Sequence, residues 1–177
     1  MPLDPPLGPN DHVSGPDDAV VQLVHYGDFE CPYSKDVYDI VSEIRERHPG
    51  RVRLAFRHFP VRSHPHALAA AVAAEAAGRQ GAFWPFHDRL YAHQLQLRPD
   101  QLVAHAEALG LDGGAVRDAL DDEGEAARVL GQKRAGVKAG VRSTLGLWID
   151  NVWFEEDGLE GALVERVIRP IQQAEAD

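Results

Sequence analysis

Apolar positions in the first third of the chain follow the periods of a strand, a helix and a second strand. The segment AVVQLVHYGDF, residues 19–29, is β-branched and largely apolar, which predicts a strand buried on both faces. Residues 32–47 carry four apolar side chains at helical spacing, namely Val37, Ile40, Val41 and Ile44. Residues 51–59 alternate along their length as a strand does. This order predicts a βαβ unit with parallel strands.

The pattern then changes to that of short helices. From His66 to about Lys138 the sequence is alanine-rich with helical repeats, and glycines and the Arg98–Pro99 step interrupt it. We expect four or five short helices there. Two strands of a hairpin and a closing amphipathic helix are expected at residues 145–150, 152–155 and 159–173. The whole order is βαβ, a helical block, and ββα.

Composition indicates how this pattern is organised into domains. Residues 1–17 hold five of the 12 prolines, which predicts an extended N-terminal arm without helix or strand. Residues 18–177 have about the length of one domain, and 44% of all residues are hydrophobic, which is enough for one core. We therefore expect a single α/β domain after the arm, with a helical insertion at about residues 64–138.

The charge of the chain argues against two classes of partner. Eighteen basic residues stand against 28 acidic ones, the formal charge is −10, and no basic cluster stands out, so nucleic acid and anionic lipid are poor partners. No apolar stretch is long enough to cross a bilayer, and the start MPLDPPLGPNDH lacks the basic and apolar regions of a secretory leader. We predict a cytoplasmic protein.

A single cysteine, Cys31, lies in the stretch GDFECPYSKDVY. One cysteine cannot form an internal disulfide or a multi-thiolate zinc site. This thiol is therefore either inert or reactive, and its reactivity depends on the residues around it.

Four phrases of the sequence, in the same order, resemble the DsbA-like branch of the thioredoxin superfamily. The first is DHVSGPDDAVVQLVHYGDFECPYS, which leads into the family's CPxC motif, and the second is FRHFPVRSHPHALAAAVAAEAA, similar to its second strand and first inserted helix. The others are GAFWPFHDRLYAHQ, similar to the next inserted helix, and AGVRSTLGLWIDN, similar to a loop and strand that usually read GVxGTPTFFING. The resemblance runs from about Asp11 to Ile168. It implies a thioredoxin-like fold with a helical insertion, and thiol–disulfide chemistry.

Two positions depart from the family's site. In the family one cysteine attacks a disulfide and another, three residues later, resolves the product; here Cys31 matches the first and Ser34 replaces the second. The family's cis-proline corresponds to Leu145, and a cis bond before a non-proline residue costs about 2.5–4 kcal/mol, so we expect a trans bond there. Because both positions differ, a deliberate replacement of one cysteine does not account for the pair. The resemblance implies four substrate-contacting positions, namely Pro32, Tyr33, Thr144 and Leu145.

The thiol of Cys31 is expected to be at least partly exposed and acidic. If Pro32 takes the first helical position, the sulfur lies at the helix N-terminus, where unpaired amides and the helix dipole favour the thiolate. Ser34 is expected to donate a hydrogen bond to the sulfur, which has the same effect. Three nearby charges also affect the thiolate. The acids Asp28 and Glu30 disfavour it, and the base Lys35 partly compensates for them. The expected thiol pKa lies below the roughly 8.5 of free cysteine.

These assignments imply chemistry with a single thiol. A serine hydroxyl cannot displace sulfur at neutral pH, so a mixed disulfide on Cys31 must wait for an outside thiol such as glutathione. We expect a thiol–disulfide oxidoreductase that acts through one cysteine on protein or small-molecule thiols. The alternative is a redox-silent protein whose groove between the Cys31 helix and the Leu145 loop binds a peptide or small molecule. Kappa-type glutathione transferases and chromene-carboxylate isomerases share the inserted helices but place serine where Cys31 stands, so they fit poorly.

Histidines are spread through the chain without the spacing of a metal site. Seven of them attract attention, namely His25, His58, His64, His66, His87, His93 and His105. None forms a pair whose spacing commits to a coordination geometry, and they fall within phrases assigned to the scaffold. We therefore name no metal ligand.

Overall fold

The structure is a computed structural model that describes residues 2–144, 146–154 and 159–176. Its strands are β1 (His12–Ser14), β2 (Val21–Gly27), β3 (Val52–His58), β4 (Gly146–Ile149) and β5 (Val152–Trp153). Its helices are α1 (Pro32–Arg47), α2 (Ala67–Arg79), α3 (Phe83–Ala92), α4 (Pro99–Ala108), α5 (Gly113–Leu120), α6 (Glu123–Lys138) and α7 (Leu159–Ala176).

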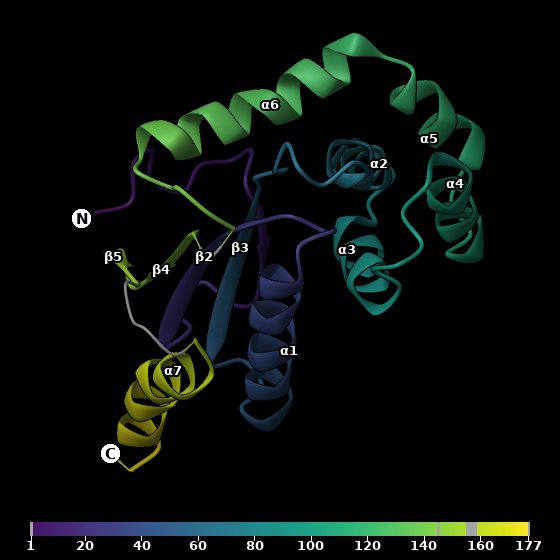
Figure 1. Ribbon diagram of the computed structural model, residues 1–177. Coiled ribbons are helices and arrows are strands. Elements are labelled where there is room, and N and C mark those ends of the chain that lie inside the picture. Colours follow the sequence, from purple (N-terminus) through teal and green to yellow (C-terminus); the bar gives the residue numbers. More distant parts are fainter. Residues whose placement is uncertain (1, 145, 155–158, 177) are drawn as a thin grey trace.

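The strands form one mixed sheet in the order β1-β3-β2-β4-β5 (Figure 1). The central strand β2 runs parallel to β3, with Val21 opposite Val52, and α1 forms the crossover between them. Strand β4 pairs antiparallel with both β2 and β5. The predicted fold class, a βαβ unit and a ββα unit with helices inserted between them, is confirmed.

Helices α1 and α7 cover one face of the sheet. Buried apolar side chains of α1, such as Val41, pack with Leu163 and Val167 of α7 against β2 and β4. Strand β4 shows the alternation that a two-faced sheet requires, because Leu147 belongs to this core while Trp148 belongs to the core of the opposite face. That opposite core also contains residues of the N-terminal arm and the segment after α6.

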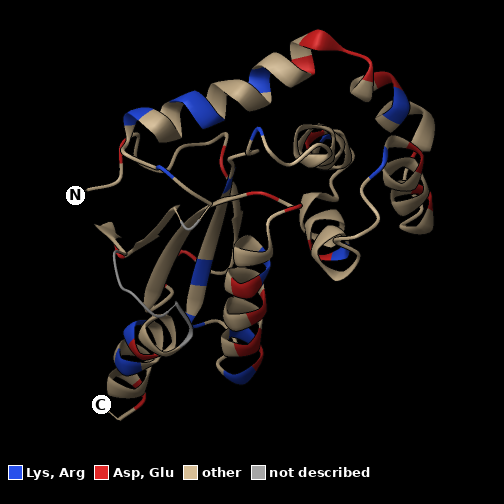
Figure 2. Cartoon of the chain, viewed as in Figure 1, with Lys and Arg blue, Asp and Glu red and all other residues tan. Residues whose placement is uncertain are grey.

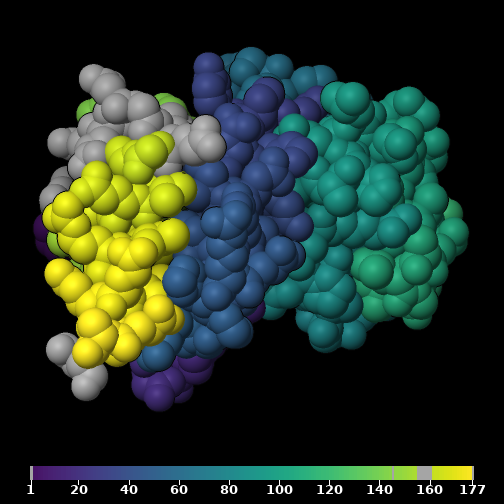
Figure 3. Space-filling model, turned by 90° about the horizontal axis from the view of Figure 1, so that it is seen from below, coloured from purple at the N-terminus to yellow at the C-terminus, as the bar shows by residue number. Residues whose placement is uncertain are grey.

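Helices α2–α5 form a lobe, which the space-filling view shows beside α1, on the side away from α7 (Figure 3). The lobe has its own core of alanines on α2 packed against aromatic side chains of α3, and Phe29 and Phe56 extend this core to the sheet. The predicted four or five helices are confirmed, since five lie between β3 and β4 in the described chain. The long α6 spans the molecule from this lobe back to the sheet (Figure 1).

The N-terminal arm contains a strand, so the prediction of neither helix nor strand there is wrong. Residues His12–Ser14 pair antiparallel with β3 and form the sheet edge. Tertiary contacts outweigh the proline-rich composition: Arg57 of β3 donates to both carboxylate oxygens of Asp11 at 2.6 and 2.8 Å and to the carbonyl oxygen of Pro5 at 2.8 Å. Burial acts to lower the pKa of Arg57, but its bonds to Asp11 and Tyr26 outweigh burial and raise it.

Charged residues of both signs are spread along the helices, and they alternate along α1 (Figure 2). Along α1, acidic and basic residues form pairs one turn apart, such as Lys35–Asp39 at 2.6 Å. Within the described ranges no helix has the length and apolar character that crossing a bilayer requires.

Candidate active site around Cys31

The end of β2 and the start of α1 place Cys31 at a helix N-terminus. Strand β2 closes at Gly27, where a Cβ atom would lie 2.4 Å from the Phe56 ring, so the chain passes close to β3 there. Cys31 is the N-cap residue with an extended backbone (φ −83°, ψ 125°), and Pro32 begins α1, as predicted. The first amides of the helix lack intrahelical partners and favour negative charge on the sulfur.

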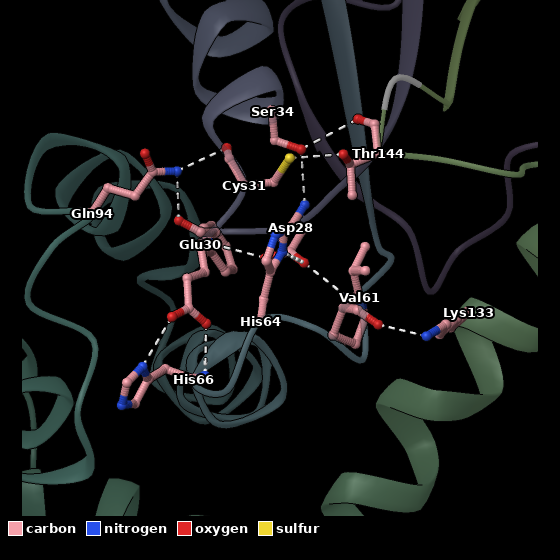
Figure 4. Close-up of polar contacts among 12 residues, drawn as sticks. Asp28, Glu30, Cys31, Ser34, Val61, His64, His66, Gln94, Lys133 and Thr144 are labelled. Atoms are coloured by element: carbon pink, nitrogen blue, oxygen red, sulfur yellow. Dashed lines mark hydrogen bonds and ion pairs between the residues drawn. The ribbon is translucent and has the colours of Figure 1, made fainter.

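The sulfur itself is buried, so the prediction of an exposed or partly exposed thiol is wrong. Cys31 is 4% exposed, and its Sγ lies 2.8 Å from Oγ1 of Thr144, in the segment that leads to β4 (Figure 4). The physical reason is tertiary: a segment 113 residues further along the chain covers the sulfur. Gln94 supports the motif from the insertion, since its Nε2 donates to the carbonyl oxygens of Phe29 and Cys31 at 2.9 and 2.8 Å.

Ser34 does not bind the sulfur, and the predicted hydrogen bond from its hydroxyl to Cys31 is wrong. Its Oγ donates to the carbonyl oxygen of Thr144 at 3.2 Å and accepts from the backbone N–H of Asp28 at 3.1 Å. A hydroxyl has one proton, so a bond to Thr144 leaves none for Cys31. Ser34 is fully buried and joins the start of α1 to the segment before β4.

Asp28 organises the loop between β2 and α1. Its side chain has no solvent exposure, and its Oδ1 accepts from the N–H of Glu30 at 2.8 Å. Its Oδ2 accepts from the N–H of Val61 and faces Nδ1 of His64, both at 2.8 Å. This carboxylate therefore joins the loop that carries Cys31 to the segment after β3, as Figure 4 shows.

The other charges near Cys31 are also engaged. Glu30 accepts from the backbone N–H of His66 at 2.6 Å and lies 2.9 Å from its Nδ1. Lys35, expected to offset the nearby acids, instead pairs with Asp39 on the outer face of α1. His64 and His66 pair with the two acids next to the cysteine, a position that was not predicted for them. The His64–Pro65–His66 step was the available signal.

A second layer of buried titratable groups lies behind the site. Burial lowers the pKa of His25 to about 3, and its Nε2 lies 3.4 Å from the Thr144 carbonyl oxygen. A carbonyl only accepts, so His25 is neutral with its proton on Nε2. Burial also raises the pKa of Tyr91 well above its ordinary value, with the charge of Asp28 adding to the effect.

The predicted substrate-contacting residues differ in exposure. Pro32 is exposed and Tyr33 is 61% exposed, both beside Cys31 at the start of α1. Thr144 is 5% exposed and touches the sulfur. Leu145 and the Thr144–Leu145 bond lie outside the described residues.

Two cavities lie away from the cysteine. The larger, of about 580 Å³, lies between the β4–β5 hairpin and α7, with Trp153 and Arg169 in its wall. The smaller, of about 280 Å³, lies where the arm meets Tyr26 and Arg57. Neither is lined by Cys31 or Ser34.

Comparison with solved structures shows the fold. The chain superimposes on oxidised BdbD from Bacillus subtilis with a TM-score of 0.78 at 23% identity, covering 90% of this chain and 92% of that one. It matches α-DsbA1 from Wolbachia pipientis with a TM-score of 0.79 at 17% identity, covering 97% and 95%.

Curated relatives are longer proteins. The chain is 47% identical over 130 residues to the Na(+)/H(+) antiporter NhaA 1 of Salinispora arenicola, covering 73% of this chain and 19% of that protein. It is 36% identical over 151 residues to the Na(+)/H(+) antiporter NhaA of Herminiimonas arsenicoxydans, covering 85% and 24%. The chain thus spans about a fifth of the length of the relatives it matches.

A family model described as thioredoxin matches residues 8–164, which is most of the chain. This range includes the strand β1, the Cys31 motif, the whole helical insertion and the β4–β5 hairpin. The chain therefore belongs to this thioredoxin family, and its fold is that of the DsbA-like members with a helical insertion.

Proposed function

We propose that the chain is a DsbA-like thiol–disulfide oxidoreductase that works through Cys31 alone, with glutathione as the thiol that completes its cycle. One observation carries the proposal: Sγ of Cys31 lies at the N-terminus of α1 with Oγ1 of Thr144 at 2.8 Å. Helix amides and a donated hydroxyl bond both stabilise a thiolate, which is the attacking form of cysteine.

The reaction takes two exchanges. The Cys31 thiolate attacks one sulfur of a disulfide, forms a mixed disulfide with it, and releases the other sulfur as a thiolate. A glutathione thiolate then attacks the partner's sulfur, which returns Cys31 as thiolate and leaves the partner joined to glutathione. No electrons are lost, because each step exchanges one thiolate for another. Ser34 takes no part in the second step, since its hydroxyl is bound to Thr144 and cannot act as a sulfur nucleophile.

Burial of the sulfur sets the rate of the first step. With 4% of Cys31 exposed, the segment at Thr144 has to move before a disulfide can reach Sγ. Pro32 and Tyr33 offer the exposed surface on which a substrate would rest, and Thr144 would join them once the segment has moved. A slow oxidoreductase is the expected result.

The relatives supply a cellular setting for the proposal. They are named as sodium–proton antiporters, and they contain a region similar to most of this chain. The proposed partner is therefore a thiol or disulfide on a transporter of that class, reached from the reducing cytoplasmic side where glutathione is available. Capture of such a transporter as a disulfide-linked adduct of Cys31, absent from the Cys31→Ser variant, would support this partner.

A second candidate function is a redox-silent binding protein. The burial of Cys31 and the cavity of about 580 Å³ next to α7 favour it, because a binding site there needs no thiol. In that case the single cysteine would serve as a small apolar residue in the core.

Incubation with oxidised glutathione distinguishes the two candidates. The oxidoreductase is expected to gain the mass of one glutathionyl group, to keep it after the reagent is removed, and to lose it when free thiol is added. Ser34→Ala should form the same adduct and Cys31→Ser none. Absence of an adduct in the folded protein, or loss of the adduct without added thiol, would contradict the proposal and favour the binding protein.

A further inference from the structure

Three side chains from distant parts of the sequence meet at one point beside the sheet. His12 comes from β1, His58 from the end of β3 and Glu75 from α2. Oε1 of Glu75 lies 2.9 Å from Nε2 of His12 and 2.9 Å from Nε2 of His58. The three potential ligand atoms all lie within 4.8 Å of one another, and no other such group of three occurs among the residues that the structure describes.

The surrounding structure holds these side chains in place. The His12 ring stacks face to face on Phe83, with ring centroids 3.5 Å apart and an interplanar angle of 2°. The His58 ring is buried among Phe29, Phe56 and Phe83. Pairing of β1 with β3 sets the position of His12 relative to His58. The cluster is therefore built before any ligand arrives, which lowers the cost of ordering.

The arrangement of the polar atoms suits a cation. Glu75 brings a carboxylate to the point where a nitrogen of each histidine ring lies 2.9 Å from its Oε1. Both imidazole rings converge on one oxygen of Glu75. A cation that accepts a lone pair from each ring and from the negatively charged carboxylate can replace both hydrogen bonds.

We propose that His12, His58 and Glu75 bind a divalent transition metal ion, with Zn²⁺ the best match. Two histidines and one carboxylate are a known zinc ligand set, and ligand distances of about 2.0–2.2 Å place the ligand atoms of a tetrahedral site roughly 3.3 Å apart. The nitrogen–oxygen separations of 2.9 Å need only a small expansion. His12 and Glu75 are 21% and 13% exposed, which leaves an approach for the ion and for a water molecule as fourth ligand.

Two consequences follow from the position of the site. Binding moves the proton of each neutral ring from Nε2 to Nδ1, and Nδ1 of His58 has no hydrogen-bond partner within the described chain. A hydrogen-bond partner on the second ring nitrogen strengthens the binding of a metal by histidine. Without one at His58, the affinity for zinc should be lower than that of a closed structural zinc site. The ion would also join the N-terminal arm to α2, because His12 belongs to the arm.

Zinc titration of the tag-free, chelator-treated full chain tests the proposal. One equivalent of Zn²⁺ should bind, and Co²⁺ in its place should show the absorption of a tetrahedral site. His12→Ala and Glu75→Gln should each weaken binding at least ~10-fold, as loss of even an outer-shell partner does. Zinc should also slow proteolytic cleavage within residues 1–11 of the wild type and leave cleavage in His12→Ala unchanged.

Matched variants keep other sources of binding apart. Cys31→Ser removes the thiol, and His48→Ala removes a histidine that pairs with Glu175 away from the cluster; both should bind zinc as the wild type does. His58 is buried, so its variant is used only if it folds, whereas His12 and Glu75 are partly exposed and serve in any case. Binding that survives in both His12→Ala and Glu75→Gln, or that is lost in Cys31→Ser, would overturn the proposal.

Discussion

Two polar clusters of the molecule contrast in their exposure and in the number of acceptor atoms that hold them together. Around Cys31, Asp28 uses both carboxylate oxygens for different donors, and the hydroxyl and carbonyl of Thr144 serve different partners. At Glu75, the rings of His12 and His58 converge on a single oxygen, and part of the cluster is exposed. The first cluster is closed, because Cys31, Ser34 and Asp28 are all buried, while the second is partly exposed and has room for a further ligand.

The contrast shows that a motif that can be recognised in the sequence need not form an accessible site in the structure. The cysteine motif can be identified from residues that are adjacent in the chain, yet its sulfur is covered by a segment far along the sequence. The histidine cluster has no local motif, yet its three ligand atoms are already together. Removing the charge of Asp28 from the closed cluster should therefore cost more stability than removing the charge of Glu75 from the open one.

The largest effect is expected from the pH dependence of His25. Its pKa is lowered by burial to about 3, whereas an unfolded chain binds a proton near 6.5. As pH falls from 6.5 to 3, the unfolded state takes up a proton that the folded state does not, so stability falls at roughly 1.4 kcal/mol per pH unit, on the order of 5 kcal/mol in total. Urea denaturation at several pH values should show this loss reduced in His25→Gln and unchanged in His48→Gln. If the free energy of unfolding of His25→Gln fell with pH as steeply as that of the wild type, the prediction would be contradicted.

Replacement of Asp28 by asparagine should lower the free energy of unfolding by about 3 kcal/mol. The amide group would turn a donor toward the N–H of Glu30 or Val61, and the charge that faces these two groups and His64 would be lost. Urea denaturation at pH 7 measures this loss of stability. The matched control is Asp36→Asn on the exposed face of α1, which should stay within about 0.5 kcal/mol of the wild type. Equal stabilities of the two variants would show that the Cys31 loop is not as closed as its contacts indicate.

Glu75→Gln tests the open cluster and should cost about 2 kcal/mol at pH 7 without added metal, because an amide oxygen accepts more weakly than a carboxylate. The pKa of Glu75 is held below its ordinary value of 4.5, so its contribution is present above that pH and is lost as pH falls further. The variant should therefore lose less stability than the wild type below pH 4.5. Glu43→Gln, in an exposed pair with Arg47, is the control and should change little. A steeper acid loss in Glu75→Gln would be inconsistent with this assignment.

The smallest effect is expected from Thr144→Val, which keeps the shape over the sulfur but removes the hydroxyl bound to Sγ of Cys31. One lost hydrogen bond should cost about 1 kcal/mol. Formation of the glutathione adduct should also slow, because the thiolate loses a donor. Thr144→Ser keeps the hydroxyl and should retain the adduct rate; if both variants react as the wild type does, the hydroxyl has no influence on the thiol.

The sequence by itself determined the fold class and the start of the site. Periodicity predicts β2, α1 and β3 because each is a local pattern of apolar positions, and Pro32 at the start of α1 follows from its own fixed backbone geometry. The resemblance in four phrases identified the helical insertion for the same reason, since each phrase is a continuous run of residues.

Only the tertiary structure decided the burial of Cys31, the partners of Ser34 and the meeting of His12 with Glu75. These contacts join residues 113, 110 and 63 positions apart. Chain separation of that size leaves no period or spacing in the sequence, because the partners are brought together by sheet pairing and core packing. The arm shows the same limit: its prolines predict an irregular segment, and strand β1 forms there because β3 offers an unpaired edge and Arg57 holds Asp11 beside it.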